Sequence, residues 1–127
     1  MRPKGWHNGP MIRGVHTMFY SSQAEDLRAF LRDKLGFEAT DVGDGWLIFD
    51  MPEADMGVHP TGTDDAQPSG TPSISFFCDD IEQTVTELKQ KGVVFKDGIK
   101  NEGFGLTTFM QAPGDFQIML YQPLYKK

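Results

Sequence analysis

The chain has little cysteine and no long apolar segment. Cys78 is the single cysteine among 127 residues, so the chain can form neither an internal disulfide nor a multi-cysteine metal cluster. Low cysteine content is typical of proteins in a reducing compartment. A bilayer-spanning helix needs ~20 consecutive apolar residues, and the sequence contains no such run. We therefore expect a cytoplasmic protein that makes no membrane contact.

Basic residues are scarce relative to acidic ones. Lys and Arg number 12 against 18 Asp and Glu, which gives a formal net charge of -6. A negatively charged chain is repelled by nucleic acid and by anionic membrane surfaces. The charge balance disfavours both classes of partner and leaves a small neutral or cationic molecule open as the ligand.

What the chain does contain is an internal repeat. Residues 14–25 (GVHTMFYSSQAE) resemble residues 71–82 (TPSISFFCDDIE) at a constant offset that pairs Phe19 with Phe76. One pair breaks the similarity, because His16 falls on Ser73. Two similar stretches of this length indicate two copies of one supersecondary unit.

The first unit, about residues 11–60, predicts the order strand, helix, strand, strand, strand. A capping box, Ser22-x-x-Glu25, precedes apolar residues at helical spacing and predicts the start of the helix. β-Branched and aromatic residues bounded by turn signals predict the strands. These strands are expected at residues 12–21, 37–41, 46–51 and 56–60.

The second unit, about residues 73–125, repeats this order. It predicts a strand at 73–78, a helix at 80–91 introduced by Asp79-x-x-Glu82, and three further strands that end near Gln122. Residues 1–10 are expected to form an N-terminal extension outside the repeat. Residues 61–72 are polar and rich in turn formers, so they are expected to link the two units.

Strand alternation sorts the candidate site residues by face. His16, Met18 and Tyr20 are expected to share one face of the first strand, because alternate side chains of a strand point the same way. The last strand is expected to place Gln117, Met119 and Tyr121 on one face by the same rule.

These features together resemble the vicinal oxygen chelate superfamily, the group of glyoxalase I, bleomycin- and fosfomycin-resistance proteins and extradiol dioxygenases. The resemblance rests on the tandem units, on the opening GVHTMFY and on the ending APGDFQIMLYQP at residues 112–123. It implies an α+β domain over residues 11–125, in which two tandem βαβββ modules form a half-open barrel around a ligand cavity. One such scaffold hosts many activities, so the resemblance is informative about fold and less so about function.

The resemblance also implies positions for a divalent metal, and the residues there fit it poorly. The four ligand positions fall on His16, on Ser73, on Met119 and near Val58 or His59. Hard and borderline divalent ions prefer carboxylate and imidazole ligands, which Ser73 and Met119 do not provide. We therefore expect no obligatory metal and no other cofactor. Were a metal present, His16 and His59 would be its ligands.

The leading hypothesis is a protein that binds a small apolar or aromatic molecule in the barrel cavity. His16 and Tyr121 are the candidate catalytic residues, although His16 can equally be a hydrogen-bonded core histidine. One alternative is a metal-dependent lyase, isomerase or dioxygenase that uses His16, His59 and an unidentified carboxylate. Another is a non-catalytic homodimeric interaction module, and a homodimer is expected in every case because half-open barrels leave unpaired sheet edges. The candidate ligand-binding residues are Met18, Tyr20, Ser73, Ser75, Phe77, Gln117 and Met119.

Overall fold

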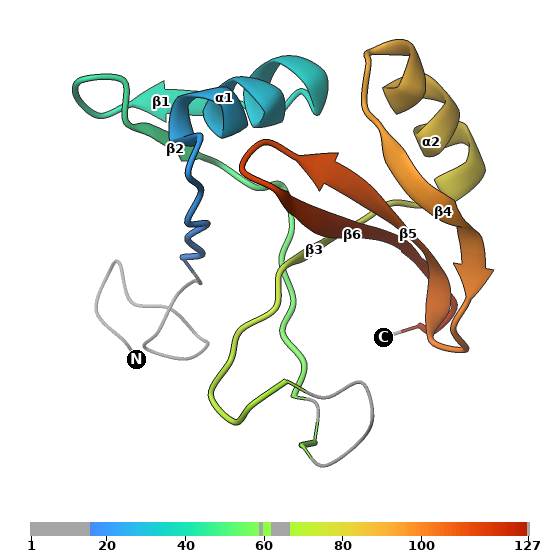
Figure 1. Ribbon diagram of the computed structural model, residues 1–127. Coiled ribbons are helices and arrows are strands. Elements are labelled where there is room, and N and C mark those ends of the chain that lie inside the picture. Colours follow the sequence, from blue (N-terminus) through green and yellow to red (C-terminus); the bar gives the residue numbers. More distant parts are fainter. Residues whose placement is uncertain (1–15, 59, 62–66, 127) are drawn as a thin grey trace, which may run out of the picture.

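The computed structural model describes residues 16–58, 60–61 and 67–126. It has the expected α+β composition and, like the sequence, divides into a first and a second unit (Figure 1). Residues 1–15, His59 and residues 62–66 lie outside the described residues, and so do the expectations that concern them. The elements in chain order are α1 (Ala24–Ala29), η1 (Phe30–Lys34), β1 (Ala39–Asp41), β2 (Leu47–Phe49), β3 (Ser75–Phe77), α2 (Ile81–Gln90), β4 (Phe95–Asn101), β5 (Gly105–Ala112) and β6 (Phe116–Pro123).

The second unit forms a four-stranded sheet in the order β3-β6-β5-β4. β3 runs parallel to β6, and the β6–β5 and β5–β4 pairs are antiparallel. A strand followed by a helix and three strands therefore builds one continuous sheet, as the sequence predicts. Among the described helices none is long and apolar enough to cross a membrane, and α2 spans only 10 residues.

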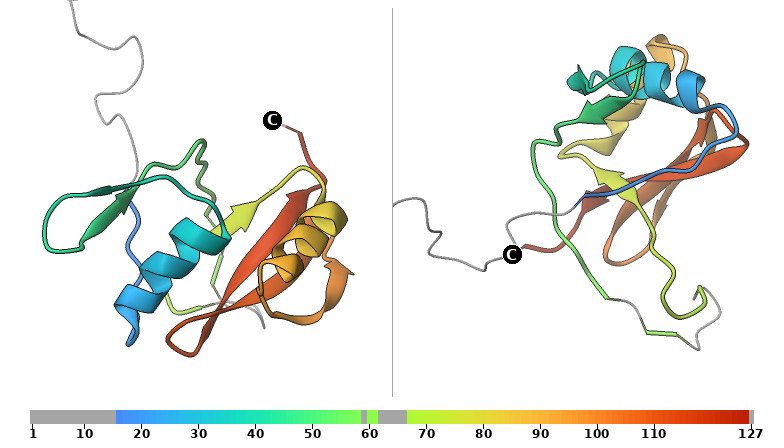
Figure 2. Two further views of the ribbon diagram at one scale, coloured as in Figure 1. Left: turned by 90° about the horizontal axis from the view of Figure 1, so that it is seen from above. Right: turned by 90° about the vertical axis from the view of Figure 1, so that its left-hand side faces the viewer.

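Both helices pack on the same face of this sheet. In Figures 1 and 2, α1 and α2 lie side by side above the strands. Their apolar stripes meet alternate residues of β5 and β6 in a single hydrophobic core. The core therefore joins the first unit to the second, and burial of this apolar area is the main stabilising contribution. Its buried members include Leu27, Phe30 and Leu31 of the first unit and Ile81, Val85, Met110, Ile118 and Leu120 of the second.

The first unit forms only a two-stranded antiparallel sheet, in which Ala39 pairs with Phe49. Two of its expected strands are wrong within the described residues, because neither residues 16–21 nor residues 56–58 are in a strand. Extended segments become strands only when a neighbouring backbone supplies hydrogen bonds. The two sheets consequently do not close into a barrel, and the fold is a half-open one.

Both expected helix caps are shifted by one residue. α1 begins at Ala24, and its N-cap Gln23 receives no side-chain cap, so the capping box at Ser22 is wrong. Instead the Ser21 hydroxyl accepts a hydrogen bond from the Gln23 N–H at 3.0 Å. In α2 the N-cap is Asp80 and not Asp79, because the Asp80 carboxylate accepts the Gln83 N–H at 3.1 Å.

A polar contact between Ser21 and the β5–β6 hairpin fixes the first unit on the second. The Ser21 hydroxyl donates a hydrogen bond to the Pro113 carbonyl at 2.8 Å. Gly114 follows in the turn with φ +103, a conformation that side chains rarely adopt, and a Cβ there would overlap the Ser21 Oγ. Glycine at 114 therefore permits both the turn and the approach of Ser21.

Candidate functional site

The face of the four-stranded sheet opposite the helices is the candidate site. We call it the open face. It consists of alternate side chains of β3, β6 and β5, which the pairing of these strands places next to one another. In one row Phe77 pairs with Tyr121 and Tyr121 with Thr107; in the next row Ser75 pairs with Met119 and Met119 with Phe109. Directly paired residues in a sheet project from the same face. The open face thus comprises Ser75, Phe77, Thr107, Phe109, Gln111, Gln117, Met119 and Tyr121.

Large apolar side chains on the two faces of β5 differ in burial. Met110 and Ile118, which project toward the helices, are each 1% exposed. Phe109, the neighbour of Met110 on β5, is 36% exposed, and Phe104 in the turn before β5 is 47% exposed. Large aromatic side chains left accessible together on one sheet face are typical of a binding surface.

Tyr121 is the most enclosed aromatic residue of the open face. Its ring lies 6.1 Å from that of Phe77 and 5.7 Å from that of Phe104, the latter at an interplanar angle of 68°. Gly105 permits this packing, because a Cβ there would stand 3.1 Å from the Tyr121 ring and 2.8 Å from the Gln122 carbonyl oxygen. The Tyr121 ring is therefore held by rings from β3 and from the β4–β5 turn.

The environment of Tyr121 keeps its hydroxyl protonated. Burial raises the pKa of Tyr121 well above its ordinary value, and the hydrogen bond with Tyr125 raises this pKa further. The hydroxyls of Tyr121 and Tyr125 are 3.0 Å apart. At neutral pH Tyr121 is therefore a neutral hydrogen-bonding group and not a phenolate base.

Cys78 lies just after β3 and is half-buried. Its N–H donates to the Tyr121 carbonyl at 2.9 Å, which extends the parallel pairing of β3 and β6. Burial raises the pKa of the Cys78 thiol. A raised pKa leaves less of the thiol as the reactive thiolate at neutral pH.

The structure brings together five of the residues singled out in the sequence. They are Ser75, Phe77, Gln117, Met119 and Tyr121, all on the open face.

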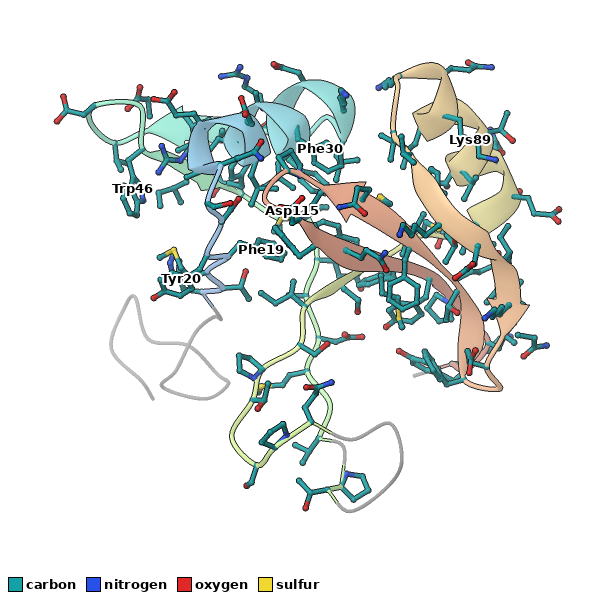
Figure 3. All side chains as sticks on the ribbon, in the orientation of Figure 1. Phe19, Tyr20, Phe30, Trp46, Lys89 and Asp115 are labelled. Atoms are coloured by element: carbon teal, nitrogen blue, oxygen red, sulfur yellow. The ribbon has the colours of Figure 1, made fainter. Side chains whose placement is uncertain are left out.

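The other candidates do not join this group. Met18 is 45% exposed and Tyr20 is 91% exposed, in a stretch that is not paired to the four-stranded sheet. His16 and Ser73 are exposed as well. Figure 3 shows Tyr20 pointing away from the sheet and Phe19 pointing toward it. Phe19 packs on Phe76 and on Phe116 at 5.8 Å, on the helix side, which agrees with the alternation expected for residues 16–20.

Three aromatic residues near or on the open face were not singled out in the sequence. Phe109 follows from strand alternation along β5 once its register with Met119 is known. Phe104 and Tyr125 are placed by contacts between segments that are distant in sequence, since the Leu124 N–H donates to the Phe104 carbonyl at 2.9 Å. The aromatic character of residues 104, 109 and 125 is visible in the sequence, but only the tertiary structure shows that they lie near one face of the sheet.

The donor set of the open face does not fit a divalent metal. Met119 and Ser75 stand opposite each other where paired strands approach, and they offer a thioether and a hydroxyl. These are poor ligands for the hard and borderline ions that carboxylate and imidazole bind. Within residues 16–58, 60–61 and 67–126, no group of three or more His, Cys, Asp or Glu side chains is arranged to hold a metal ion.

Two hollows are lined mostly by residues outside the open face. One, of about 390 Å³, is lined by residues 36–38 and 50–52 beside the two-stranded sheet. The other, of about 560 Å³, lies between α1–η1 and the β5–β6 hairpin and has Asp26, Asp33, Lys34 and Asp115 on its walls. Neither of these two hollows is lined by the aromatic residues of the open face.

Residues 13–120 match the model of the Glyoxalase/Bleomycin resistance protein/Dioxygenase superfamily. The chain belongs to this superfamily. No curated protein sequence matches it significantly.

Solved structures of this superfamily resemble the chain in fold. TnmS3, an antibiotic binding protein from Streptomyces sp. CB03234, has a TM-score of 0.62 and 24% identity, over 91% of this chain and 99% of the other. A lactoylglutathione lyase from Agrobacterium tumefaciens has a TM-score of 0.61 and 16% identity, over 90% and 96% of the two chains. A superfamily member from Sphaerobacter thermophilus DSM 20745 has a TM-score of 0.59 and 26% identity, over 89% and 99%.

Proposed function

We propose that the protein binds a small apolar or aromatic molecule on the open face, without an obligatory metal. The observation that carries this proposal is the aromatic surface formed by Phe77, Phe104, Phe109 and Tyr121, of which Phe104 and Phe109 are accessible to solvent. Flat apolar ligands gain affinity from such rings through area burial and offset or edge-to-face stacking. Met119 adds an adaptable, polarisable side chain between them.

Superfamily membership supports a binding role and leaves the ligand open. A structural relative, TnmS3, is an antibiotic binding protein, which shows that this fold can serve binding. The lyase alternative draws support from the fold of the Agrobacterium tumefaciens relative alone, at 16% identity. Of its three required groups, His16 is exposed in the segment before α1, His59 is outside the described residues and the carboxylate is unidentified. The binding proposal needs none of these groups.

Titration calorimetry with 2-ethylnaphthalene, a flat hydrocarbon, tests the proposal. We expect saturable binding to the wild-type protein that EDTA does not change. Phe109→Lys, which places a charge on the open face, should abolish binding. Its matched control is Val42→Lys, because Val42 is 63% exposed and lies in the first unit, just after β1. Binding that is lost with EDTA would contradict the proposal, and so would binding that survives Phe109→Lys but fails in Val42→Lys.

We also propose that the protein is a homodimer in which a second copy covers the incomplete first unit. Apolar side chains stand exposed in the two stretches expected to be strands: Tyr20 is 91%, Met56 80% and Val58 97% exposed. Backbone without a strand partner beside exposed apolar residues favours pairing with another chain. A monomer at micromolar concentration in sedimentation velocity would contradict this part of the proposal. A reducing, cytoplasmic setting belongs to the same proposal and is supported by the single cysteine.

A further inference from the structure

The C-terminal residues fold back onto the open face. β6 ends at Pro123, and the Leu124 N–H then donates to the Phe104 carbonyl at 2.9 Å, which fixes the chain beside the turn between β4 and β5. This contact brings Tyr125 over Tyr121, with their hydroxyls 3.0 Å apart. Tyr125 is 44% exposed and Tyr121 only 8% exposed, so Tyr125 presents the pair to solvent.

The pair of hydroxyls can donate one further hydrogen bond to an acceptor. Each phenol carries one proton and can also accept, so a hydrogen bond between the two hydroxyls uses only one of the two protons. When Tyr121 donates to Tyr125, the remaining proton is that of the Tyr125 hydroxyl, which is the more exposed of the two. Accepting the bond from Tyr121 polarises the Tyr125 hydroxyl and makes it a better donor. Because burial raises the pKa of Tyr121, that hydroxyl keeps its proton at neutral pH.

Rings adjoin this polar pair within the same surface. Phe104 contacts the Tyr121 ring edge to face at 5.7 Å, and Phe77 lies at 6.1 Å on β3. Phe109 is exposed in the neighbouring row of the sheet. A planar ligand stacked on these rings would place its edge near the Tyr125 hydroxyl.

We propose that Tyr125, positioned by Tyr121, is a specificity-determining residue that selects planar aromatic molecules carrying a hydrogen-bond acceptor over hydrocarbons of the same shape. The inference rests on the proposed function, since it concerns the ligand of the same open face. Tyr125 would donate its proton to the acceptor, such as an aromatic ketone oxygen. Tyr121 holds the Tyr125 hydroxyl in place and is a positioning residue. A site built to hydrogen-bond its ligand discriminates against an analogue that lacks the acceptor.

Two probes of nearly equal shape isolate this hydrogen bond. 2-Acetylnaphthalene carries a carbonyl acceptor, and 2-ethylnaphthalene has the same rings without one. By titration calorimetry we expect the wild-type protein to bind the ketone about two- to ten-fold more tightly, the range of one net hydrogen bond. Tyr125→Phe should remove this preference, so that the two probes bind with similar Kd values. Tyr121→Phe should reduce the preference without abolishing it.

A matched control removes a hydroxyl elsewhere. Thr86→Val deletes an exposed hydroxyl on α2, which bonds to the Glu82 carbonyl, and should retain the full preference for the ketone. A far-UV circular dichroism spectrum like that of the wild-type protein checks in each variant that the fold is retained.

The outcomes separate this inference from the proposed function. If the wild-type protein binds both naphthalenes equally, or if Tyr125→Phe still prefers the ketone, the role of Tyr125 is wrong and the binding role of the open face stands. If the wild-type protein binds neither probe, both are wrong.

Discussion

The two units differ in structure although their sequences predict the same order of elements. The second unit forms a four-stranded sheet, whereas the first forms a two-stranded one. The second-unit helix, α2, spans 10 residues and is capped by Asp80, while α1 spans 6 residues before its last turns widen into the π-type segment η1. A sequence repeat thus specifies which segments can become strands, and the available partner strands decide which of them do.

The π-type turns of the first unit serve the shared core. The Leu35 N–H donates to the Phe30 carbonyl, five residues back, at 3.1 Å. Phe30 and Leu31, which begin this segment, are both buried against the second-unit sheet. The first unit therefore depends on the second for the burial of its apolar residues, and the following substitutions test this asymmetry.

The largest expected effect comes from matched isoleucines in the two sheets. Ile118 of β6 is 1% exposed in the shared core, so Ile118→Ala should lower the free energy of unfolding by about 2–5 kcal/mol. Ile48 of β2 is only half-buried, and Ile48→Ala should cost less than about 1.5 kcal/mol. Urea unfolding of both variants measures the difference. Equal losses would show that the two units contribute equally to the core.

The contact between the units is tested at Gly114. Gly114→Ala combines an unfavourable φ with an overlap on Ser21, and we expect a loss of about 1–3 kcal/mol. Gly45 has φ +82 but has nothing within 4 Å of an added Cβ, so Gly45→Ala should cost about 1 kcal/mol from the backbone alone. Thermal unfolding compares the two. A cost at Gly114 no greater than that at Gly45 would show that the Ser21 contact does not constrain the hairpin.

A smaller difference is expected between the helix caps. Asp80→Ala removes the carboxylate that accepts the Gln83 N–H, at a cost of about 1 kcal/mol. Ser22→Ala, at the position that the capping box predicts, should change stability by no more than about 0.5 kcal/mol because Ser22 does not cap α1. The order of the two urea midpoints checks this assignment, and a reversed order would restore the capping box of the first unit.

The smallest effect is a change with pH at the junction of Tyr121 and Tyr125. The pKa of Tyr121 is raised in the folded protein above its ordinary 10.0, so folding favours the protonated form. The resulting stability is fully present below about pH 10 and is lost as the pH rises further toward the folded pKa. As the pH rises from about 9 to about 12, Tyr121→Phe should therefore lose less stability than the wild-type protein. Tyr20→Phe is the control: Tyr20 is 91% exposed, so the stability of this variant should follow the same pH dependence as that of the wild-type protein. Identical stability–pH curves for the wild-type protein and both variants would exclude a role for the burial of Tyr121.

Local sequence signals predict the second unit well. Turn residues at 103–105 and 113–115 separate β4, β5 and β6, and alternation along β6 correctly assigns Ile118 and Leu120 to the core side. The failures occur where the outcome depends on distant residues. Residues 56–58 have strand-like composition but are not in a strand of the described chain. The Ser21 hydroxyl donates to the distant Pro113 carbonyl and accepts the Gln23 N–H, and α1 starts one residue later than the capping box predicts.

In the candidate site, too, local sequence signals predict some residues, and contacts between distant segments place the others. Alternation predicts that Gln117, Met119 and Tyr121 share a face, and the register adds Ser75 and Phe77 to it. Sequence alone does not reveal Phe104 and Tyr125, because their positions depend on a hydrogen bond between the β4–β5 turn and the residues after β6. The expected roles of His16 and His59 stay predictions.

The most direct test of ligand binding at the open face compares two methionines of the same sheet. Met119 of β6 lies on the open face, and Met110 of β5 is 1% exposed on the helix side. With ¹³C-labelled methionine methyl groups, titration with 2-acetylnaphthalene should shift the NMR signal of Met119 and leave that of Met110 in place. Ring currents act over short distances, so the shift reports which face the probe touches. A shift of Met110 with Met119 unchanged would contradict binding at the open face.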